Sequence, residues 1–394
     1  MKKSVVAILV CVLFLLSFGL VMLYSASYPF ALRSSQYNYN PLWFLNRQLT
    51  WIGIGLVAML VTAAVDYNRW RKFAWLLWIV AVVLCALVLV PGIGKMINGS
   101  RRWLQFGSIQ PSELGKVAVI LLLAHYLDRW QRNVREVRAK KCFLFRQDLA
   151  DLGRGFVMPM LIMGVVVSLV VLETDAGTSA LIALVALCVM FLGGVRWWLL
   201  WPTFAAGGGL FAWFLVFDPV RGKRIRDFYD FWNHIQDTCY QQWQGMLAFG
   251  CGGVTGVGLG QSRTKEHYLP YASSDFIGPI CGEELGLIGM AALLIAFVVL
   301  IGVGVYVSTR ARELYGCLLG MGIVALIGFQ ALINLAVVTA LMPNKGLPLP
   351  FISYGGSNLC VMLACVGLLL SVARHAGAPE AAPVSPFTRR ATAV

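Results

Sequence analysis

Ten long stretches of apolar residues dominate the chain, and shorter polar segments separate them. The stretches lie at 4–27 and at about 49–65, 73–90, 112–128, 155–172, 177–194, 197–217, 284–306, 315–342 and 357–373. A helix needs about 20 apolar residues to cross the hydrocarbon core of a bilayer. Because every backbone N–H and C=O group must be paired inside lipid, such segments form helices. The pattern predicts an all-α polytopic integral membrane protein with about ten transmembrane helices.

The first stretch predicts a retained span, because it is longer than the apolar core of a secretory signal. Lys and Arg then gather in alternate connecting segments, at 66–72, 129–154 and 307–314. An excess of basic residues marks cytoplasmic segments, so both termini are expected in the cytoplasm. Residues 1–374 form the predicted membrane domain, and 375–394, which are rich in Ala and Pro, predict a disordered cytoplasmic tail.

Composition excludes a soluble domain, since 59% of the residues are apolar and 13% are charged. The net charge of +14 follows from the basic connecting segments, so no nucleic acid partner is expected. Four histidines show no metal-ligand spacing, and a His-based metal site is not expected: His125, His234, His267 and His375. Ten cysteines form no CxxC pair, and a disulfide among Cys239, Cys251 and Cys281 is left open.

Three polar segments are predicted to open on the same outer face of the membrane, at 95–116, 218–283 and 342–357. Of these, 218–283 is the large extracytoplasmic loop between spans 7 and 8. Its part at 221–250 mixes basic and aromatic residues, which suits interfacial helices at the headgroup level. An anchor without chemistry and a cradle for a lipid substrate are both compatible with that composition.

The large loop also contains a glycine-rich part and ends in an acid. No strand precedes the glycines at 250–260, so a nucleotide-binding fold is not expected, although backbone N–H groups there could approach a phosphate. Asp275 closes the loop at the mouth of the next span. A carboxylate at that place is either a helix N-cap or part of a site.

Several motifs in these outer segments, and in the same order, resemble the SEDS proteins, the ten-span membrane glycosyltransferases of bacterial cell-wall synthesis. The motifs are NGSRRWL (98–104), QPSELGK (110–116), GLGQS (258–262), DFI (275–277) with GEELG (282–286), and LPFISYGGS (349–357). The resemblance covers about Gly19 to Arg374. It is closer to the division branch, FtsW, than to the elongation branch, RodA, on the sequence FLGGVR (191–196) and on Lys345 before Gly346.

The resemblance implies that the chain polymerises lipid II into glycan strands on the outer face of the inner membrane, at the division septum. It implies partners as well: lipid II and the lipid-linked glycan, a class B penicillin-binding protein that crosslinks the product, and other divisome membrane proteins. By motif position, Asp275 matches the family's essential aspartate, Trp103 its outer-loop tryptophan, and Lys345 a functionally important lysine. Two departures stand out: LPYASSD (269–275) lacks the Glu and His of the family motif, and TDAGT (174–178) has Thr in place of Pro.

Glycosyl transfer from a lipid diphosphate needs a base for the acceptor hydroxyl and positive charge for the leaving group. Asp275 is the predicted general base, because partial burial would raise its pKa. The substrate-binding candidates are Trp103, Arg101, Arg102, Lys345, Arg263, Lys265, Glu113, Lys116 and Ser353. Glu113 and Lys116 are spaced i, i+3, so a structural ion pair is equally open. Glu283 and Glu284 could hold a divalent cation, Mg²⁺ or Mn²⁺, and no organic cofactor is expected.

Two other classes of function stay open. A transporter that moves the same lipid would need intramembrane charges, and Glu113, Glu173 and Asp175 lie within or beside predicted spans. A transporter would, however, distribute polar residues to both faces, whereas the motifs here face outward. A scaffold without catalysis is the third reading, and the acid and the cations of the outer segments argue against it.

Overall fold

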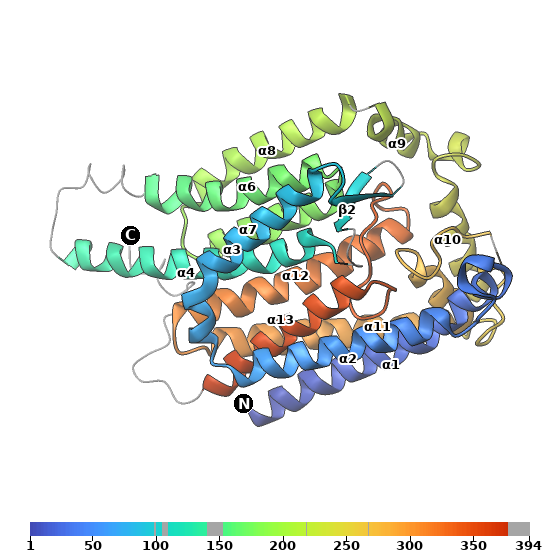
Figure 1. Ribbon diagram of the computed structural model, residues 1–394, viewed down its shortest axis with the longest axis horizontal. Helices are drawn as coiled ribbons and strands as arrows, with labels where there is room; N and C mark the ends of the chain where they lie inside the picture. The colour runs from blue at the N-terminus through green and yellow to red at the C-terminus, as the bar shows by residue number, and fades with distance from the viewer. Residues whose placement is uncertain (98–99, 105–108, 140–152, 218, 267, 377–394) are drawn as a thin grey trace.

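The computed structural model describes residues 1–97, 100–104, 109–139, 153–217, 219–266 and 268–376. Long helices lie side by side through the molecule (Figure 1). They are α1 (Lys2–Arg33), α2 (Trp43–Ala64), α3 (Tyr67–Leu89), α4 (Pro111–Ala139), α6 (Met158–Leu172), α7 (Ala176–Leu192), α8 (Trp197–Phe217), α11 (Ile277–Thr309), α12 (Leu314–Val338) and α13 (Gly356–His375). Each predicted span overlaps one of these helices.

Seven helices within the described residues are long and apolar enough to cross a membrane, and α7 is a shorter apolar helix. The multi-pass membrane fold is therefore confirmed, while the count of ten spans stays a prediction. The largest difference in a boundary is at α11, which begins at Ile277 rather than near 284. The predicted tail at 375–394 and part of the inner segment 129–154 lie outside the described residues.

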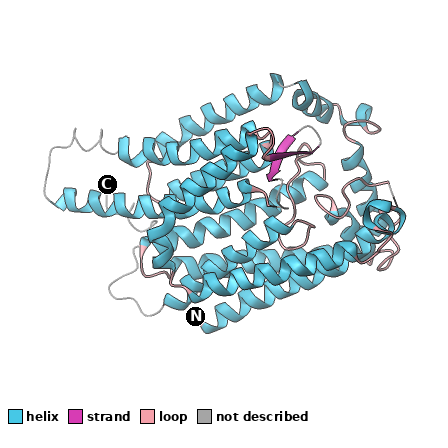
Figure 2. Cartoon of the chain, viewed as in Figure 1, coloured by secondary structure: helices cyan, strands magenta, loops and turns pink. Residues whose placement is uncertain are grey.

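Short elements gather toward one end of the bundle, away from the N-terminus (Figure 1). They are the 3₁₀-helix η1 (Ser35–Tyr37), the helices α9 (Pro219–Tyr229) and α10 (Tyr240–Gly252), the 3₁₀-helix η3 (Phe231–His234), and the strands β1 (Gly94–Ile97) and β2 (Ser100–Leu104). A short π-helix, η2 (Gly153–Val157), precedes α6. The two strands pair as an antiparallel hairpin, which Figure 2 shows among the helices. This end carries the predicted outer segments.

Small residues allow the helices to approach closely. A Cβ on Gly367 of α13 would lie 2.0 Å from the Thr62 hydroxyl of α2, and that hydroxyl also donates to the Ala364 carbonyl at 3.0 Å. On α12, a Cβ at Gly322 would lie 2.6 Å from Ile120 of α4. Membrane helices associate mainly through such close packing and through hydroxyl hydrogen bonds, because lipid gives them no hydrophobic driving force.

A charge network joins the three predicted inner segments at the other end. Arg71 pairs with Asp128 at 2.6 Å and with Glu313 at 3.3 Å, while Arg132 pairs with the same two carboxylates at 3.1 and 3.0 Å. These residues come from three segments that the charge pattern assigned to one face. Their meeting agrees with the predicted topology.

Helix α11 is broken at Gly286, whose φ of 64° lies in the left-handed region. The break frees backbone groups that the helix would otherwise pair. The glycine-rich loop after α10 takes them up: Val257 and Gly258 donate to the carbonyls of Glu283 and Glu284 at 3.0 and 3.1 Å, and Leu287 donates to Gly253 at 3.0 Å. Three of the loop's backbone groups are thus bound to α11, so the phosphate-binding role left open for 250–260 does not fit them.

Candidate functional site

Asp275 lies where the large outer loop meets the segment between α12 and α13. The Tyr354 backbone N–H donates to the Ser273 carbonyl at 3.0 Å, and the Ser353 hydroxyl donates to the Ser274 carbonyl at 2.6 Å. From within α12, the Asn334 amide donates to the Asp275 carbonyl at 2.8 Å. Backbone atoms on both sides of the acid are therefore held by residues more than 50 positions away in the sequence.

The carboxylate of Asp275 is half-buried beneath the backbone of Gly346. A Cβ added to Gly346 would lie 3.0 Å from the Asp275 Oδ2 atom, so only glycine leaves this approach unobstructed. Burial raises the pKa of Asp275 to about 6, the negative charge of Asp175 raises it further, and the Arg102 guanidinium opposes both effects. A carboxylate with this pKa is largely ionised at pH 7 and can still accept and release a proton, which suits a general base.

Arg102 reaches the same region from strand β2. Its Nη2 atom donates to the Thr174 carbonyl at 2.8 Å, and its Nη1 atom lies 3.8 Å from Asp175 Oδ2. Thr174 adopts a left-handed φ of 64°, which is uncommon for a residue other than glycine. Proline, which the SEDS pattern has at this position, cannot adopt that φ, so the predicted local change at Thr174 is a change of backbone conformation.

Asp175 is buried and caps α7. It accepts hydrogen bonds from the Thr178 N–H at 3.1 Å and from the Thr178 hydroxyl at 2.9 Å, and the Gln110 amide donates to it at 3.1 Å. This is the ordinary N-cap role of aspartate. It also places a negative charge close enough to Asp275 to affect its pKa.

Glu173, directly after α6, is a second unusual acid at this place. It is 1% exposed, burial raises its pKa to about 8, and the charge of Asp175 adds to that effect. At pH 7 it is therefore mostly protonated. A neutral Glu173 leaves Arg102 as the counter-charge of Asp175 and Asp275.

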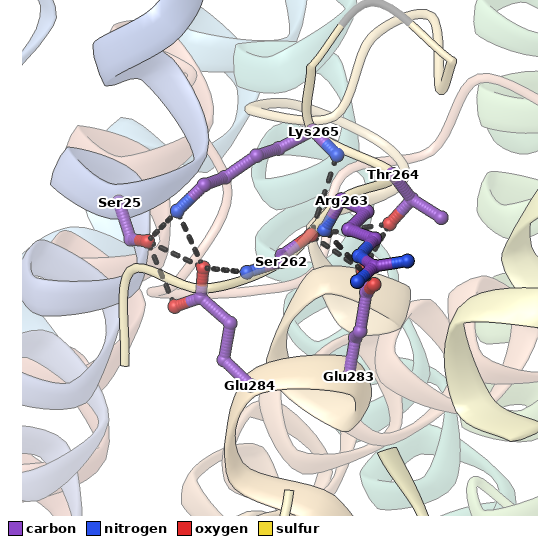
Figure 3. Close-up of polar contacts among 7 residues, drawn as sticks. All are labelled: Ser25, Ser262, Arg263, Thr264, Lys265, Glu283 and Glu284. Atoms are coloured by element: carbon purple, nitrogen blue, oxygen red, sulfur yellow. Dashed lines mark hydrogen bonds and ion pairs between the residues drawn. The ribbon is translucent and has the colours of Figure 1, made fainter. Parts of the chain in front are cut away.

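A buried polar network fixes the segment before Asp275 (Figure 3). Lys265 forms an ion pair with Glu284 of α11 at 2.7 Å, and its ammonium also donates to the Ser25 hydroxyl of α1 at 2.9 Å. The Ser25 hydroxyl in turn donates to the Glu284 carboxylate at 2.7 Å. The pair thus joins the outer loop to two helices, and Lys265 has a structural partner rather than the diphosphate predicted for it.

Glu283 turns toward the same loop. It accepts hydrogen bonds from the hydroxyls of Ser262 and Thr264 and from the Arg263 backbone N–H. Adjacent glutamates thereby have separate sets of donors, one cationic and one neutral. These donor groups occupy the carboxylate oxygens, so the divalent cation predicted at Glu283 and Glu284 does not fit the two residues.

Comparison with known proteins decides the family. The family model FTSW_RODA_SPOVE, described as a cell cycle protein, matches residues 6–378. The chain belongs to the FtsW/RodA/SpoVE family. The resemblance to SEDS proteins drawn from the motifs is confirmed.

Similar proteins include members of the FtsW and SpoVE branches. The chain is 38% identical over 383 residues to a probable peptidoglycan glycosyltransferase FtsW of Coxiella burnetii, covering 94% of this chain and 98% of that protein. It is 38% identical over 373 residues to the stage V sporulation protein E of Bacillus subtilis, covering 93% of this chain and 96% of that one.

Solved structures agree on the fold. A chain from the structure titled "Structural coordination of polymerization and crosslinking by a peptidoglycan synthase complex" has a TM-score of 0.70 and 25% identity, covering 94% of this chain and 97% of that one. The RodA protein of Thermus thermophilus has a TM-score of 0.65 and 26% identity, covering 93% and 95%.

In this FtsW/RodA/SpoVE member, three other candidates have structural partners. Lys116 pairs with Glu113 at 2.8 Å, and both are buried; Lys116 also donates to Gln330 of α12 at 3.0 Å, and Asn358 of α13 donates to Glu113 at 2.9 Å. This is the ion pair that the i, i+3 spacing left open. Ser353 accepts from the Leu349 N–H at 2.8 Å and holds the Asp275 segment, so it too supports the site rather than contacting a ligand.

The remaining candidates stay accessible at the outer end. Arg263 is exposed, and Arg101, Trp103 and Lys345 are half-buried. Trp103 lies on β2 opposite Lys95, and Lys345 directly precedes Gly346. The disulfide left open among Cys239, Cys251 and Cys281 is absent from the described residues, where all three are free thiols.

Sequence reasoning missed two residues that position Asp275. Asn334 is a buried amide inside an apolar span, and a polar residue at such a place was a signal for function or support. Gly346 follows Lys345 in a motif already noted. Its role depends on a close approach between segments about 70 residues apart, which the sequence pattern does not encode.

Proposed function

We propose that the chain is a peptidoglycan glycosyltransferase that polymerises lipid II into glycan strands during septal cell-wall synthesis. The observation that carries the proposal is the half-buried Asp275, with a pKa of about 6, among outer segments that also bring Arg102 and Lys345. The names of the similar FtsW proteins support the reaction class. The outer face supports a substrate that is a lipid with a polar head.

In the proposed reaction, Asp275 removes the proton from the acceptor sugar hydroxyl. The hydroxyl oxygen then forms a bond to the anomeric carbon of the donor sugar, and the bond from that carbon to the lipid diphosphate breaks. Arg102, Lys345, Arg101 and Arg263 stabilise the negative charge on the leaving diphosphate, because preorganised cations act most strongly where charge develops. Trp103 would stack against a sugar face.

A divalent cation remains a proposal for this reaction. It would neutralise diphosphate oxygens, and it needs ligands other than Glu283 and Glu284. Removal by a chelator, followed by addition of Mg²⁺ or Mn²⁺, tests the requirement.

For a partner, we propose a class B penicillin-binding protein, as in the complex named by the similar structure. An apolar hollow between α10, α11 and α12 supports this, and Leu287 and Leu332 beside it are each 63% exposed. Gly282, Gly286 and Ala336 line it, and small residues let a partner's transmembrane helix approach closely. The bacterial inner membrane, the septum and cytoplasmic termini are part of the same proposal.

The test uses purified protein with and without a co-expressed class B penicillin-binding protein, labelled lipid II and a divalent cation. A gel that resolves glycan chains compares wild type with Asp275→Asn and with Glu266→Gln, a control acid that is exposed on the same loop. We expect polymer from wild type and Glu266→Gln, and none from a folded Asp275→Asn. Equal polymer from Asp275→Asn would overturn the assignment. If wild type makes none with its partner but carries lipid II across liposomes, the transporter reading replaces it.

A further inference from the structure

The outer loop holds a second polar cluster that the glycosyl-transfer proposal does not use. Asp227 near the end of α9, His234 at the end of η3, and Asp237 each offer one ligand atom, and these atoms all lie within 4.8 Å of one another. His234 Nε2 lies 3.7 Å from Asp227 Oδ1 and 3.8 Å from Asp230 Oδ2. Four potential ligands thus come from an eleven-residue segment, 227–237.

Asp227 is oriented for such a role. It is 6% exposed, its Oδ2 atom accepts a hydrogen bond from Thr238, and its Oδ1 atom is the one nearest His234. A second-shell hydroxyl that fixes one carboxylate oxygen and leaves the other toward a histidine is a common arrangement around metal ligands. The Cys239 thiol also donates to the Asp227 carbonyl at 3.5 Å, which holds the backbone.

Charge favours a cation at this place. Three carboxylates surround the imidazole, and the cation that the structure places against them is Lys223, 3.2 Å from Asp237 Oδ2. Lys223 and Asp237 are 54% and 65% exposed, so this pair is weak and easily exchanged. A divalent ion that replaced the ammonium would interact with every carboxylate of the cluster at once.

We propose that Asp227, His234 and Asp237 form a binding site for a divalent transition metal, Zn²⁺ or Mn²⁺, with Asp230 available as a fourth ligand. Metal–ligand bonds of about 2.1 Å in a tetrahedral site place ligand atoms about 3.4 Å apart. The two printed separations of 3.7 and 3.8 Å need only a few tenths of an ångström of movement. An imidazole donor favours these metals over Mg²⁺ and Ca²⁺, which prefer oxygen ligands.

The site would fasten the end of α9 to the start of α10. Trp232 lies between the ligands in sequence and packs against Trp243 of α10, with ring centroids 5.5 Å apart. Metal binding therefore orders an aromatic part of the outer loop, and indole fluorescence can report it. The inference does not depend on the proposed glycosyl transfer, because it concerns a metal and a segment separate from Asp275.

The experiment titrates Co²⁺, a spectroscopic substitute for Zn²⁺, into full-length protein in detergent, purified without a histidine tag and stripped with a chelator. We expect one equivalent of Co²⁺, visible absorption bands that Zn²⁺ abolishes, and a change in indole fluorescence. His234→Gln and Asp237→Asn should each weaken binding at least tenfold. Asp237 is exposed, so its variant keeps the fold.

The matched control is His375→Gln, since His375 lies 4.0 Å from Asp66 in a His–carboxylate pair at the predicted inner face. It should bind Co²⁺ like wild type. Absence of binding to wild type, or equal binding by wild type and both loop variants, overturns the proposal. Loss of binding in His375→Gln alone overturns it too, because it moves the metal to the other side.

Discussion

The two charges beside Asp275 give the strongest test of its role as a base. Arg102 lowers the pKa of Asp275, and Asp175 raises it. Arg102→Gln should therefore raise the pKa and move the acid limb of the rate profile to higher pH. Asp175→Asn should lower the pKa and move the limb to lower pH. Asparagine is as good an N-cap as aspartate, so α7 keeps its start.

The size of the effect follows from the pKa. With a pKa of about 6, Asp275 is about 9% ionised at pH 5, whereas with the ordinary value of 3.8 it would be about 94% ionised. The rate of wild type at pH 5 should then be about one-tenth of its value at pH 8. A movement of one pKa unit in either variant changes the relative rate at pH 5 by up to about tenfold.

The assay is kcat/KM for lipid II polymerisation between pH 4.5 and 8.5, as about nine points, because its acid limb reports the essential base of the free enzyme. Arg102→Lys keeps the charge and serves as the control, with a limb near that of wild type. Lower activity alone proves nothing, since Arg102 also faces the leaving group. Movement of both limbs in the same direction, or of neither, would refute the reasoning.

Three further outcomes follow from the structure. Because the folded-state pKa of Asp275 is raised, stability falls as pH rises from about 4 to 6, so the thermal midpoint of Asp275→Asn should exceed that of wild type at pH 7.5 and match it near pH 4. Lys265→Met leaves the Glu284 charge buried and should cost about 3–5 kcal/mol, whereas the double variant with Glu284→Gln should recover much of it in a thermal-unfolding cycle. Gly256→Ala puts a Cβ 2.2 Å from the Glu284 carbonyl and should lower the thermal midpoint more than Gly260→Ala, which shares a left-handed φ but meets open space; equal losses would contradict the role of Gly256.

Apolar periodicity and charge bias were enough to predict the membrane fold, because lipid leaves helices as the main solution for long apolar segments. The same reasoning placed Asp275, Arg102 and Lys345 on one face, and it needed only the order of the spans. It could not place Asn334 or Gly346 beside Asp275. Those contacts depend on how the spans pack against one another.

The errors have a common physical cause. Lys265 was predicted to face the diphosphate because it is a cation in an outer loop, but its partner Ser25 lies 240 residues earlier. Glu283 and Glu284 were predicted as metal ligands because they are adjacent acids, and their donors come from 262–265. Histidine spacing alone argued against a metal site, whereas His234 meets aspartates that a helix and a turn bring round to it.

The network around Lys265 also explains how a mobile type of segment can carry a base with a defined position. Buried ion pairs add little net stability, because desolvation offsets the attraction, but they penalise arrangements that separate the partners. Here the pair requires α1, α11 and the outer loop to come together, since Ser25, Glu284 and Lys265 each bind the other two. Ten residues later the chain reaches Asp275, where Asn334 and the backbone around Ser353 hold it again. A loop fixed at both ends in this way positions a carboxylate as a rigid element does, and the geometry of a general base depends on that.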